Sequence, residues 1–333
     1  MSWEKHLWPE WKIEQMIGSG ACGNVYRIKR QDIGGTYYAA LKVISCPKKA
    51  NELENILDIS KEIAVMEKLK GNTNIVSYED HKIISNDDGL YILIRMELLT
   101  PLQDYLKTHE IDEKEVCRIG IDICKALLLC EKENIIHRDV KPGNIFVSSY
   151  GDFKLGDFSL VQHTKLYQNV VEPCGTYVYM APEVQNGTDY DSTIDIYSLG
   201  LILYRLLNKG RGPFEPLPPV VLNDEIIRTA NQKRLCSATF PKPINASAVM
   251  STIILRACAN DPLQRYSSPK EFQNALMKYS STHGIVEVKR QISSYIKKAA
   301  GILSEPDIED MRSEESNSRQ KNMDEFFVSA GDL

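Results

Sequence analysis

Apolar and polar residues alternate with a period of two in several short stretches of the first hundred positions. This alternation is typical of half-buried strands and predicts strands at 11–17, 25–28, 37–44, 75–84 and 90–97. Residues 51–69 follow a helical period instead, with an apolar stripe at Ile59, Ile63, Met66 and Leu69. The pattern therefore predicts five strands and one helix in a small unit that ends near Leu99.

From Pro101 onward the pattern becomes helical. We expect helices at 102–109 and 113–131, the longer of which carries an apolar stripe at Val116, Ile119, Ile123, Leu127 and Cys130. Residues 193–209 are apolar nearly all round, which predicts a buried helix, and Asp195 within it needs hydrogen-bond donors. This larger unit is expected to end near Tyr279.

The end of the chain has a different pattern. Apolar residues recur at roughly helical spacing over 286–303, among lysines and arginines, until Pro306 ends the pattern. This amphipathic helix is expected either to pack on the larger unit or to dock on a partner or an anionic surface. The acidic sequence after it is expected to be disordered. The expected organisation is an N-terminal extension and three further parts, at 1–10, 11–99, 100–280 and 281–333.

Composition narrows the class of protein. With 333 residues, 43% of them hydrophobic, the chain can bury one large core or two smaller ones. A net charge of -5 gives no footprint for nucleic acid. The best apolar run, 199–207, is shorter than the roughly 18 residues of a membrane span, and the first residues lack the apolar core of a signal peptide. We therefore expect a soluble, cytoplasmic protein without a transmembrane segment; the sequence does not indicate an oligomeric state.

Cysteine and tryptophan are placed unevenly. The eight cysteines are scattered without a C-x-x-C pair, which fits neither a zinc site nor a disulfide framework, so reduced thiols, mostly in the core, are expected. All three tryptophans, Trp3, Trp8 and Trp11, fall in the first eleven residues. We expect them to pack around the start of the first strand rather than to form a binding cage.

Two stretches of the small unit carry candidate phosphate-binding groups. Between the first two predicted strands lies a G-x-G-x-x-G string, Gly18, Gly20 and Gly23, whose backbone N–H groups could cover phosphates, although plain glycine hairpins have similar sequences. Lys42 stands among apolar residues of the next strand, so its ammonium either reaches solvent or needs a counterion. Glu62, which interrupts the apolar stripe of the helix, is the expected counterion.

Residues 137–146, with the sequence His-Arg-Asp-Val-Lys-Pro-Gly-Asn-Ile-Phe, concentrate further chemistry. Pro142 and Gly143 exclude a regular helix here, so a rigid loop is expected. Asp139, Lys141 and Asn144 supply a carboxylate to accept a proton, a cation for a phosphoryl group and an oxygen ligand for magnesium. Phosphoryl transfer requires this combination of groups.

The same residues match the catalytic loop of protein kinases, and the chain resembles the eukaryotic-type (Hanks-type) serine/threonine protein kinases over about residues 11–279. The resemblance implies an α+β, two-lobed fold, with a small antiparallel β-sheet N-lobe that has one helix and a larger, mainly helical C-lobe. It implies an enzyme that transfers the γ-phosphoryl group of Mg-ATP to Ser or Thr hydroxyls of proteins and that autophosphorylates. A soluble bacterial member or a minimal cytosolic member of the family would suit the sequence.

The resemblance also assigns catalytic roles. Asp139 is the base, Lys141 and Lys42 contact phosphates, and Glu62 orients Lys42. Thr176 is the hydroxyl that links Asp139 and Lys141 in members directed to Ser and Thr.

Magnesium and adenine are assigned in the same way. Asn144 and Asp157 are expected to bind magnesium, with two ions present. Met96 is expected at the back of the adenine pocket, backbone groups of Glu97 and Leu99 hydrogen-bond the base, and apolar side chains enclose it from Ile17, Val25, Ala40 and Phe146.

Other family positions are structural or regulatory. Asp195 is expected to hold the catalytic-loop backbone, and Glu183 to pair with Arg265. Ser159 stands where the family normally has glycine, which would restrict a backbone flip. Of the hydroxyls Ser159, Thr164 and Tyr167, we expect Thr164 to be self-phosphorylated.

Two rival functions remain open at this point. The first is a nucleotide-binding pseudokinase scaffold, for which Ser159 is the sole support. The second is a small-molecule kinase of the aminoglycoside type, which shares the loop chemistry. Such an enzyme would not be expected to carry Thr176, the Ala-Pro-Glu string at 181–183 and Arg265.

Overall fold

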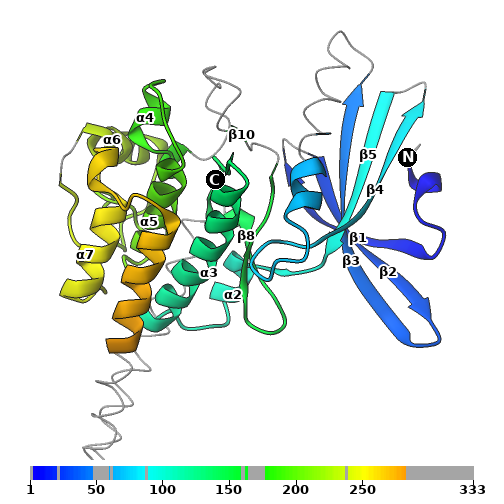
Figure 1. The fold of residues 1–333 in the computed structure, drawn as a ribbon, viewed down its shortest axis with the longest axis horizontal. Coiled ribbons are helices and arrows are strands. Elements are labelled where there is room, and N and C mark those ends of the chain that lie inside the picture. Colours follow the sequence, from blue (N-terminus) through cyan, green and yellow to red (C-terminus); the bar gives the residue numbers. More distant parts are fainter. Residues whose placement is uncertain are drawn as a thin grey trace, which may run out of the picture. The chain divides into compact units, whose positions relative to one another are not determined.

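The computed structural model of this chain describes residues 3–20, 23–47, 60, 63–86, 89–158, 162–163, 177–236 and 239–282. The chain divides into two compact units. Unit 1 comprises residues 1–102 and 144–161, and unit 2 comprises residues 103–143 and 162–333. Unit 1 contains most of the strands and unit 2 most of the helices (Figure 1).

Unit 1 is built on a five-stranded antiparallel sheet with the strand order β1-β2-β3-β5-β4 (Figure 1). The strands are β1 (Trp11–Gly20), β2 (Gly23–Asp32), β3 (Gly35–Pro47), β4 (Tyr78–Asn86) and β5 (Gly89–Glu97). Residues 63–68 are helical, and the rest of the predicted helix, except Ser60 and Leu69, lies outside the described residues. The expected antiparallel sheet is confirmed. A predicted strand start at 75 is corrected to Tyr78, because Ile75 instead bridges to Leu155.

The register of the sheet separates its two faces. Residues paired directly across neighbouring strands share a face. Val25 pairs with Lys42 and Lys42 with Ile94, while Ala40 pairs with Met96. These side chains therefore lie on one face, which we call face A. The opposite face, face B, carries Tyr26, Ile28, Leu41, Val43 and Leu93.

Face B is covered by the first described residues of the chain. Trp3, Trp8 and Trp11 are buried in one core cluster with the face B side chains. The Trp8 indole N–H donates to Asp80 at 2.8 Å, and the Arg95 guanidinium lies 4.8 Å from the centre of the Trp8 ring. The expected packing of the three indoles around the first strand is confirmed, and the segment 3–11 belongs to the core of unit 1.

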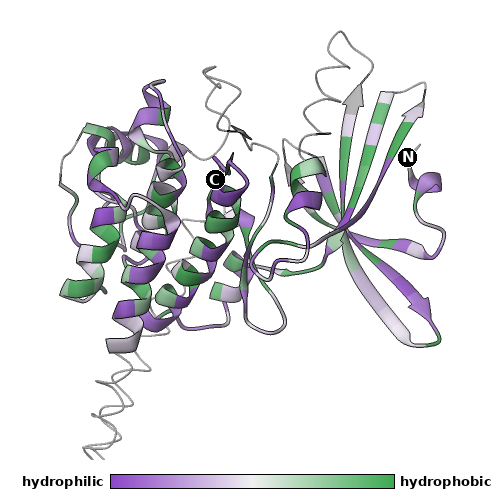
Figure 2. Ribbon diagram, in the orientation of Figure 1, coloured by the Kyte–Doolittle hydropathy of each residue, from purple (hydrophilic) through white to green (hydrophobic). Residues whose placement is uncertain are grey.

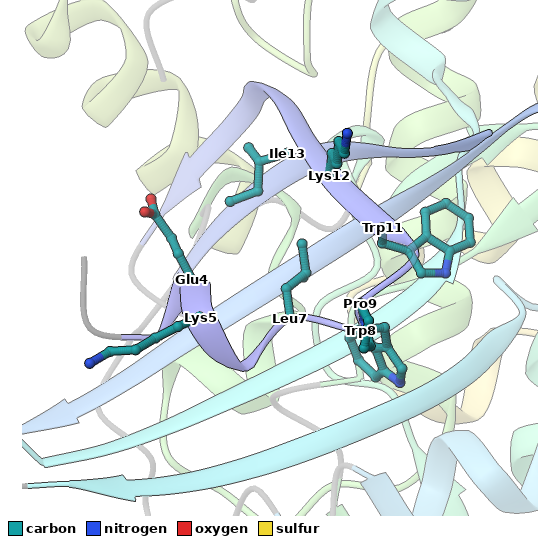
Figure 3. A pocket seen from close by; sticks show the side chains of 8 residues that line it. All are labelled: Glu4, Lys5, Leu7, Trp8, Pro9, Trp11, Lys12 and Ile13. Atoms are coloured by element: carbon teal, nitrogen blue, oxygen red, sulfur yellow. The ribbon is translucent and has the colours of Figure 1, made fainter.

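Beside the indoles lies a pocket of about 460 Å³ (Figure 3). It is lined by Glu4, Lys5, Leu7, Trp8, Pro9, Trp11, Lys12 and Ile13. All of these residues come from one continuous stretch, and none of them is a predicted nucleotide-binding residue.

A second sheet of unit 1 has three short strands in the order β6-β8-β9. They are β6 (Thr100–Pro101), β8 (Ile145–Val147) and β9 (Phe153–Leu155), and both pairings are antiparallel. The connector 74–77 holds β9, because the Leu155 N–H donates to the Asn74 C=O and the Val76 N–H to the Leu155 C=O, each at 2.9 Å. Asp157 comes two residues after the end of β9.

Unit 2 is mainly helical, and hydrophobic and hydrophilic bands alternate along its helices (Figure 2). Its helices are α2 (Leu102–Leu106), α3 (Glu113–Lys132), α4 (Pro182–Gln185), α5 (Thr193–Leu206), α6 (Asp224–Cys236), α7 (Ala248–Ala257) and a last one at 269–282. Two short strands, β7 (Ile135–Ile136) and β10 (Gln162–His163), pair antiparallel. The mainly helical second unit is as expected.

Two helices of unit 2 show why its elements form where they do. The Asp112 carboxylate accepts a hydrogen bond from the Glu115 N–H at 2.8 Å and so caps the start of α3. In α5 every residue from Thr193 to Tyr204 is buried, and the helix contacts both α3 and α7. The predicted buried helix is confirmed, and it ends at Leu206.

A buried ion pair connects α4 with the segment after α7. The Arg265 guanidinium donates to both carboxylate oxygens of Glu183, at 2.5 and 2.7 Å, and its side chain has no exposed surface. The predicted pair is confirmed. Within the described ranges, none of the helices combines the length and apolar character that a membrane crossing requires.

Replacing Trp8 with alanine should lower the free energy of unfolding by about 3 to 5 kcal/mol, because a buried indole and its bond to Asp80 are lost. Urea unfolding followed by circular dichroism measures the change. Ile33→Ala, at a fully exposed position, is the control and should cost less than about 0.5 kcal/mol. Equal stability of the two variants would contradict the packing of residues 3–11 in the core.

Four described thiols should resist alkylation in the native protein. Cys117, Cys124, Cys130 and Cys258 are buried, and burial raises the pKa of each, to about 12 for Cys117. Because the thiolate is the reactive form, iodoacetamide at about pH 8 should modify the exposed Cys236 and spare these four until urea is added. Mass spectrometry of tryptic peptides checks this. If the native protein were modified at these four thiols as fast as at Cys236, their burial would be contradicted.

Candidate active site

The loop 137–141 of unit 2 is held by a carboxylate from the buried helix α5. The His137 and Arg138 backbone N–H groups each donate to Asp195, both at 2.8 Å. Arg138 has φ 69°, a left-handed conformation that persists only where its surroundings fix it. Burial raises the pKa of Asp195, and the nearby His137 and the two backbone donors oppose that rise. The expectation that Asp195 holds this loop is confirmed.

Asp139 and Lys141 lie side by side on this loop. The Lys141 ammonium is 2.9 Å from an Asp139 carboxylate oxygen, and the two side chains are 27% and 11% exposed. A partly shielded carboxylate on a fixed loop can serve as a general base. Thr176, the third predicted member of this set, lies outside the described residues.

In unit 1, Lys42 of β3 contacts Asp157 instead of standing alone in its strand. The Lys42 ammonium lies 2.9 Å from a carboxylate oxygen of Asp157, and the Lys42 side chain is only 9% exposed. The predicted partner of Lys42, Glu62, lies outside the described residues. The pair with Asp157 was not predicted from the sequence, because 115 positions separate the two residues and no local pattern connects them.

A backbone hydrogen bond holds the segment of Asp157 beside Asn144. The Gly156 N–H donates to the Asn144 C=O at 2.9 Å. A Cβ at Gly156 would lie 2.6 Å from the Val76 side chain and 3.1 Å from the Phe146 ring, so only glycine fits. Carboxylate and amide oxygens are the hard ligands that magnesium prefers, so the chemistry of this pair fits the ion.

The predicted adenine-binding residues lie partly on face A. Val25, Ala40 and Met96 share this face with Lys42, and Gly18 pairs with Val25 across β1 and β2. Phe146 is in β8, Ile17 is an exposed residue of β1, and Leu99 follows β5 and is partly buried. The register thus brings four predicted residues together on one surface of the sheet.

The glycines of the predicted phosphate loop lie at the paired ends of β1 and β2, where Gly20 pairs with Gly23. Gly20 ends β1 and Gly23 begins β2, with φ 122° at Gly23, a conformation that suits glycine. Added bulk at Gly23 would collide with the Val43 carbonyl. The Ser19 hydroxyl donates to the Asn24 side-chain oxygen at 2.8 Å and links the two strand ends.

The side chain of Glu97 forms an ion pair that was not predicted from the sequence. Its carboxylate pairs with Lys154, and its backbone N–H donates to the Ser77 C=O at 3.0 Å. Lys154 was missed, although a lysine between Phe153 and Leu155 of a buried strand is the same signal that drew attention to Lys42.

Several other predictions cannot be placed. Ser159, Thr164 and Tyr167 lie outside the described residues, as does the predicted helix 286–303 with the tail after it.

The chain is similar to known proteins along most of its length. The family described as protein kinase domain matches residues 11–277. The "Probable serine/threonine-protein kinase CPE1738" of Clostridium perfringens is 32% identical over 281 residues, which cover 82% of this chain and 39% of that protein. The serine/threonine-protein kinase KIC1 of Saccharomyces cerevisiae is 28% identical, with 86% and 25% covered. An Aurora kinase of Debaryomyces hansenii is 27% identical, with 77% and 59% covered. The chain thus spans less than two thirds of each relative.

Asp195→Asn should lower the free energy of unfolding by about 2 to 4 kcal/mol, because an amide cannot accept from both backbone donors as the carboxylate does. Urea unfolding measures this change, and hydrogen exchange of the His137 and Arg138 amides should be faster than in the wild type. Asp224→Asn, at an exposed position at the start of α6, is the control. Unchanged exchange in Asp195→Asn would contradict the role of α5.

Proposed function

Because this chain belongs to the protein kinase domain family, we propose that it is a serine/threonine protein kinase that transfers the γ-phosphoryl group of Mg-ATP to protein hydroxyls. The observation that carries the proposal is the pair of Asp139 and Lys141 on a loop fixed by Asp195. The contact between Lys42 and Asp157 supports the proposal, because phosphoryl transfer requires a lysine at the phosphates and an aspartate that binds magnesium.

In the proposed reaction, Asp139 accepts the proton of a Ser or Thr hydroxyl. The hydroxyl oxygen forms the new bond to the γ-phosphorus, and the bond from that phosphorus to the ADP oxygen breaks. Lys141 offsets the charge of Asp139 and of the phosphoryl group. Lys42, oriented by Glu62, contacts the α- and β-phosphates beneath the loop of Gly18, Gly20 and Gly23.

Asn144 and Asp157 are proposed to hold magnesium, with two ions bound. Magnesium would supply positive charge that stabilises the phosphates. The Lys42 ammonium contacts Asp157 at 2.9 Å and would hold its carboxylate in place for the ion.

The adenine ring is proposed to lie against face A, enclosed by Ile17, Val25, Ala40 and Phe146, with Met96 behind it. The Leu99 backbone and the Glu97 carbonyl are assigned to hydrogen bonds with the base. For Glu97 the carbonyl is chosen because its N–H already donates to Ser77.

Substrate class and regulation are proposed from Lys141, Thr176, Arg138 and Thr164. Lys141 together with Thr176 favours Ser and Thr over Tyr as acceptors. Arg138, next to Asp139, would bind a phosphate on Thr164 after autophosphorylation. The unpaired thiols favour a reducing compartment, and we place the protein in the cytoplasm.

Asp139→Ala should fold normally yet lose about two to four decades of turnover, because the group that accepts the proton is gone. Purified protein incubated with radiolabelled ATP, magnesium and a generic basic protein tests both the activity and the variant. Asp104→Ala, at an exposed residue paired with Lys107, is the control and should retain full activity. Nucleotide binding without any transfer by the wild type would instead favour a pseudokinase scaffold, and near-wild-type transfer by Asp139→Ala would refute the role of the base.

A further inference from the structure

An ion pair joins the end of β5 to β9, two strands of unit 1 that belong to different sheets. The Lys154 ammonium lies 2.7 and 2.9 Å from the two carboxylate oxygens of Glu97. The two side chains are 12% and 24% exposed, so water screens the pair only weakly. The pair therefore fixes the separation of the two strands at this point.

The connector 74–77 completes the link from both sides. The Ser77 N–H donates to the Glu97 carboxylate at 2.5 Å, and the Glu97 N–H donates to the Ser77 C=O at 3.0 Å. On the other side, the Asn74 side-chain amide donates to the Phe153 C=O at 2.9 Å. Glu97, the connector and Lys154 thus form a closed ring of contacts.

This ring controls where Asp157 lies. Asp157 comes two residues after the end of β9, and Gly156 between them is confined by Val76 of the connector. Asp157 has φ 59°, a left-handed conformation that is uncommon for residues other than glycine and that its surroundings must support. A shift of β9 would therefore move the carboxylate that contacts Lys42.

We propose that Glu97 and Lys154 are positioning residues for nucleotide binding, an inference that rests on the proposed function. Their ion pair holds two parts of the nucleotide site in one block, namely the backbone of Glu97 at the adenine and the carboxylate of Asp157 at the magnesium. Neither side chain contacts the nucleotide. Loss of the pair leaves β9 and the end of β5 free to shift apart. The groups that bind the adenine and the metal then no longer fit one Mg-nucleotide at the same time.

Lys154→Met tests this, because it removes the ammonium and keeps an unbranched apolar chain. The Kd for Mg-ADP, measured by isothermal titration calorimetry, should rise about tenfold, the size typical of groups that orient a metal ligand. Glu97→Gln should also raise the Kd for Mg-ADP. The Kd of the double variant should be no higher than the higher of the two single-variant values, because both substitutions remove the same interaction. Lys154→Arg retains the charge and should restore most of the affinity.

The matched control is Glu79→Gln. Glu79 lies in the same sheet and pairs with Arg95 at 2.8 Å, with a partly exposed carboxylate, and its loss should leave Mg-ADP binding unchanged. In steady-state kinetics, Lys154→Met should raise the KM for ATP and leave the KM for the protein substrate as it was.

The outcomes separate this inference from the proposed function. Wild-type Mg-ADP affinity in Lys154→Met would overturn the positioning role while leaving the kinase assignment intact. An equal loss in Glu79→Gln, or no recovery in Lys154→Arg, would also overturn it, because general loosening of the fold would then explain the effect. Failure of the wild-type protein to bind Mg-ADP at all would overturn both proposals.

Discussion

The contact between the Lys42 ammonium and the Asp157 carboxylate, at 2.9 Å, links the middle of the five-stranded sheet to the segment that follows β9. A lysine shielded from water to this degree is tolerated only with a counterion. The segment after β9 must therefore lie against face A, and the other contacts of unit 1 are arranged to hold it there. The connector 74–77, the backbone of Asn144 and the glycine at 156 each restrain this same stretch.

Unit 2 uses the same principle with different groups. The buried carboxylate of Asp195 is satisfied by backbone N–H donors, and in accepting them it fixes the loop that carries Asp139 and Lys141. The fully buried Arg265 finds its partner in Glu183 on α4. In both units, then, a charge placed in the interior orders a loop, and the loop carries the chemistry. Apart from Lys141, the described residues proposed to bind ATP and magnesium are in unit 1, whereas Lys141 and the proposed base Asp139 are in unit 2.

Local patterns in the sequence were sufficient for the elements themselves. The alternation in 37–44 and the all-round apolar pattern of 193–209 correspond to β3 and α5, since each pattern reflects the side on which an element is buried. Asp195, Glu183 and Arg265 could be placed through the family resemblance. The pairs of Lys42 with Asp157 and of Lys154 with Glu97 could not, because the partners are 115 and 57 positions apart and many other carboxylates were available. The roles of Asp139, Lys141, Asn144 and Asp157 in catalysis stay predictions.

The three indoles of this chain all lie within residues 3–11, buried against face B. Intrinsic tryptophan emission therefore comes from unit 1 alone, although the helical unit is the larger of the two by residue number. A spectroscopist who follows unfolding by fluorescence would watch the strand-rich unit lose its structure, while the far-ultraviolet helix signal would report chiefly on the other. The native chain thus carries its own domain-specific reporter, and a difference between the two optical transitions would reveal whether the units melt together or in succession.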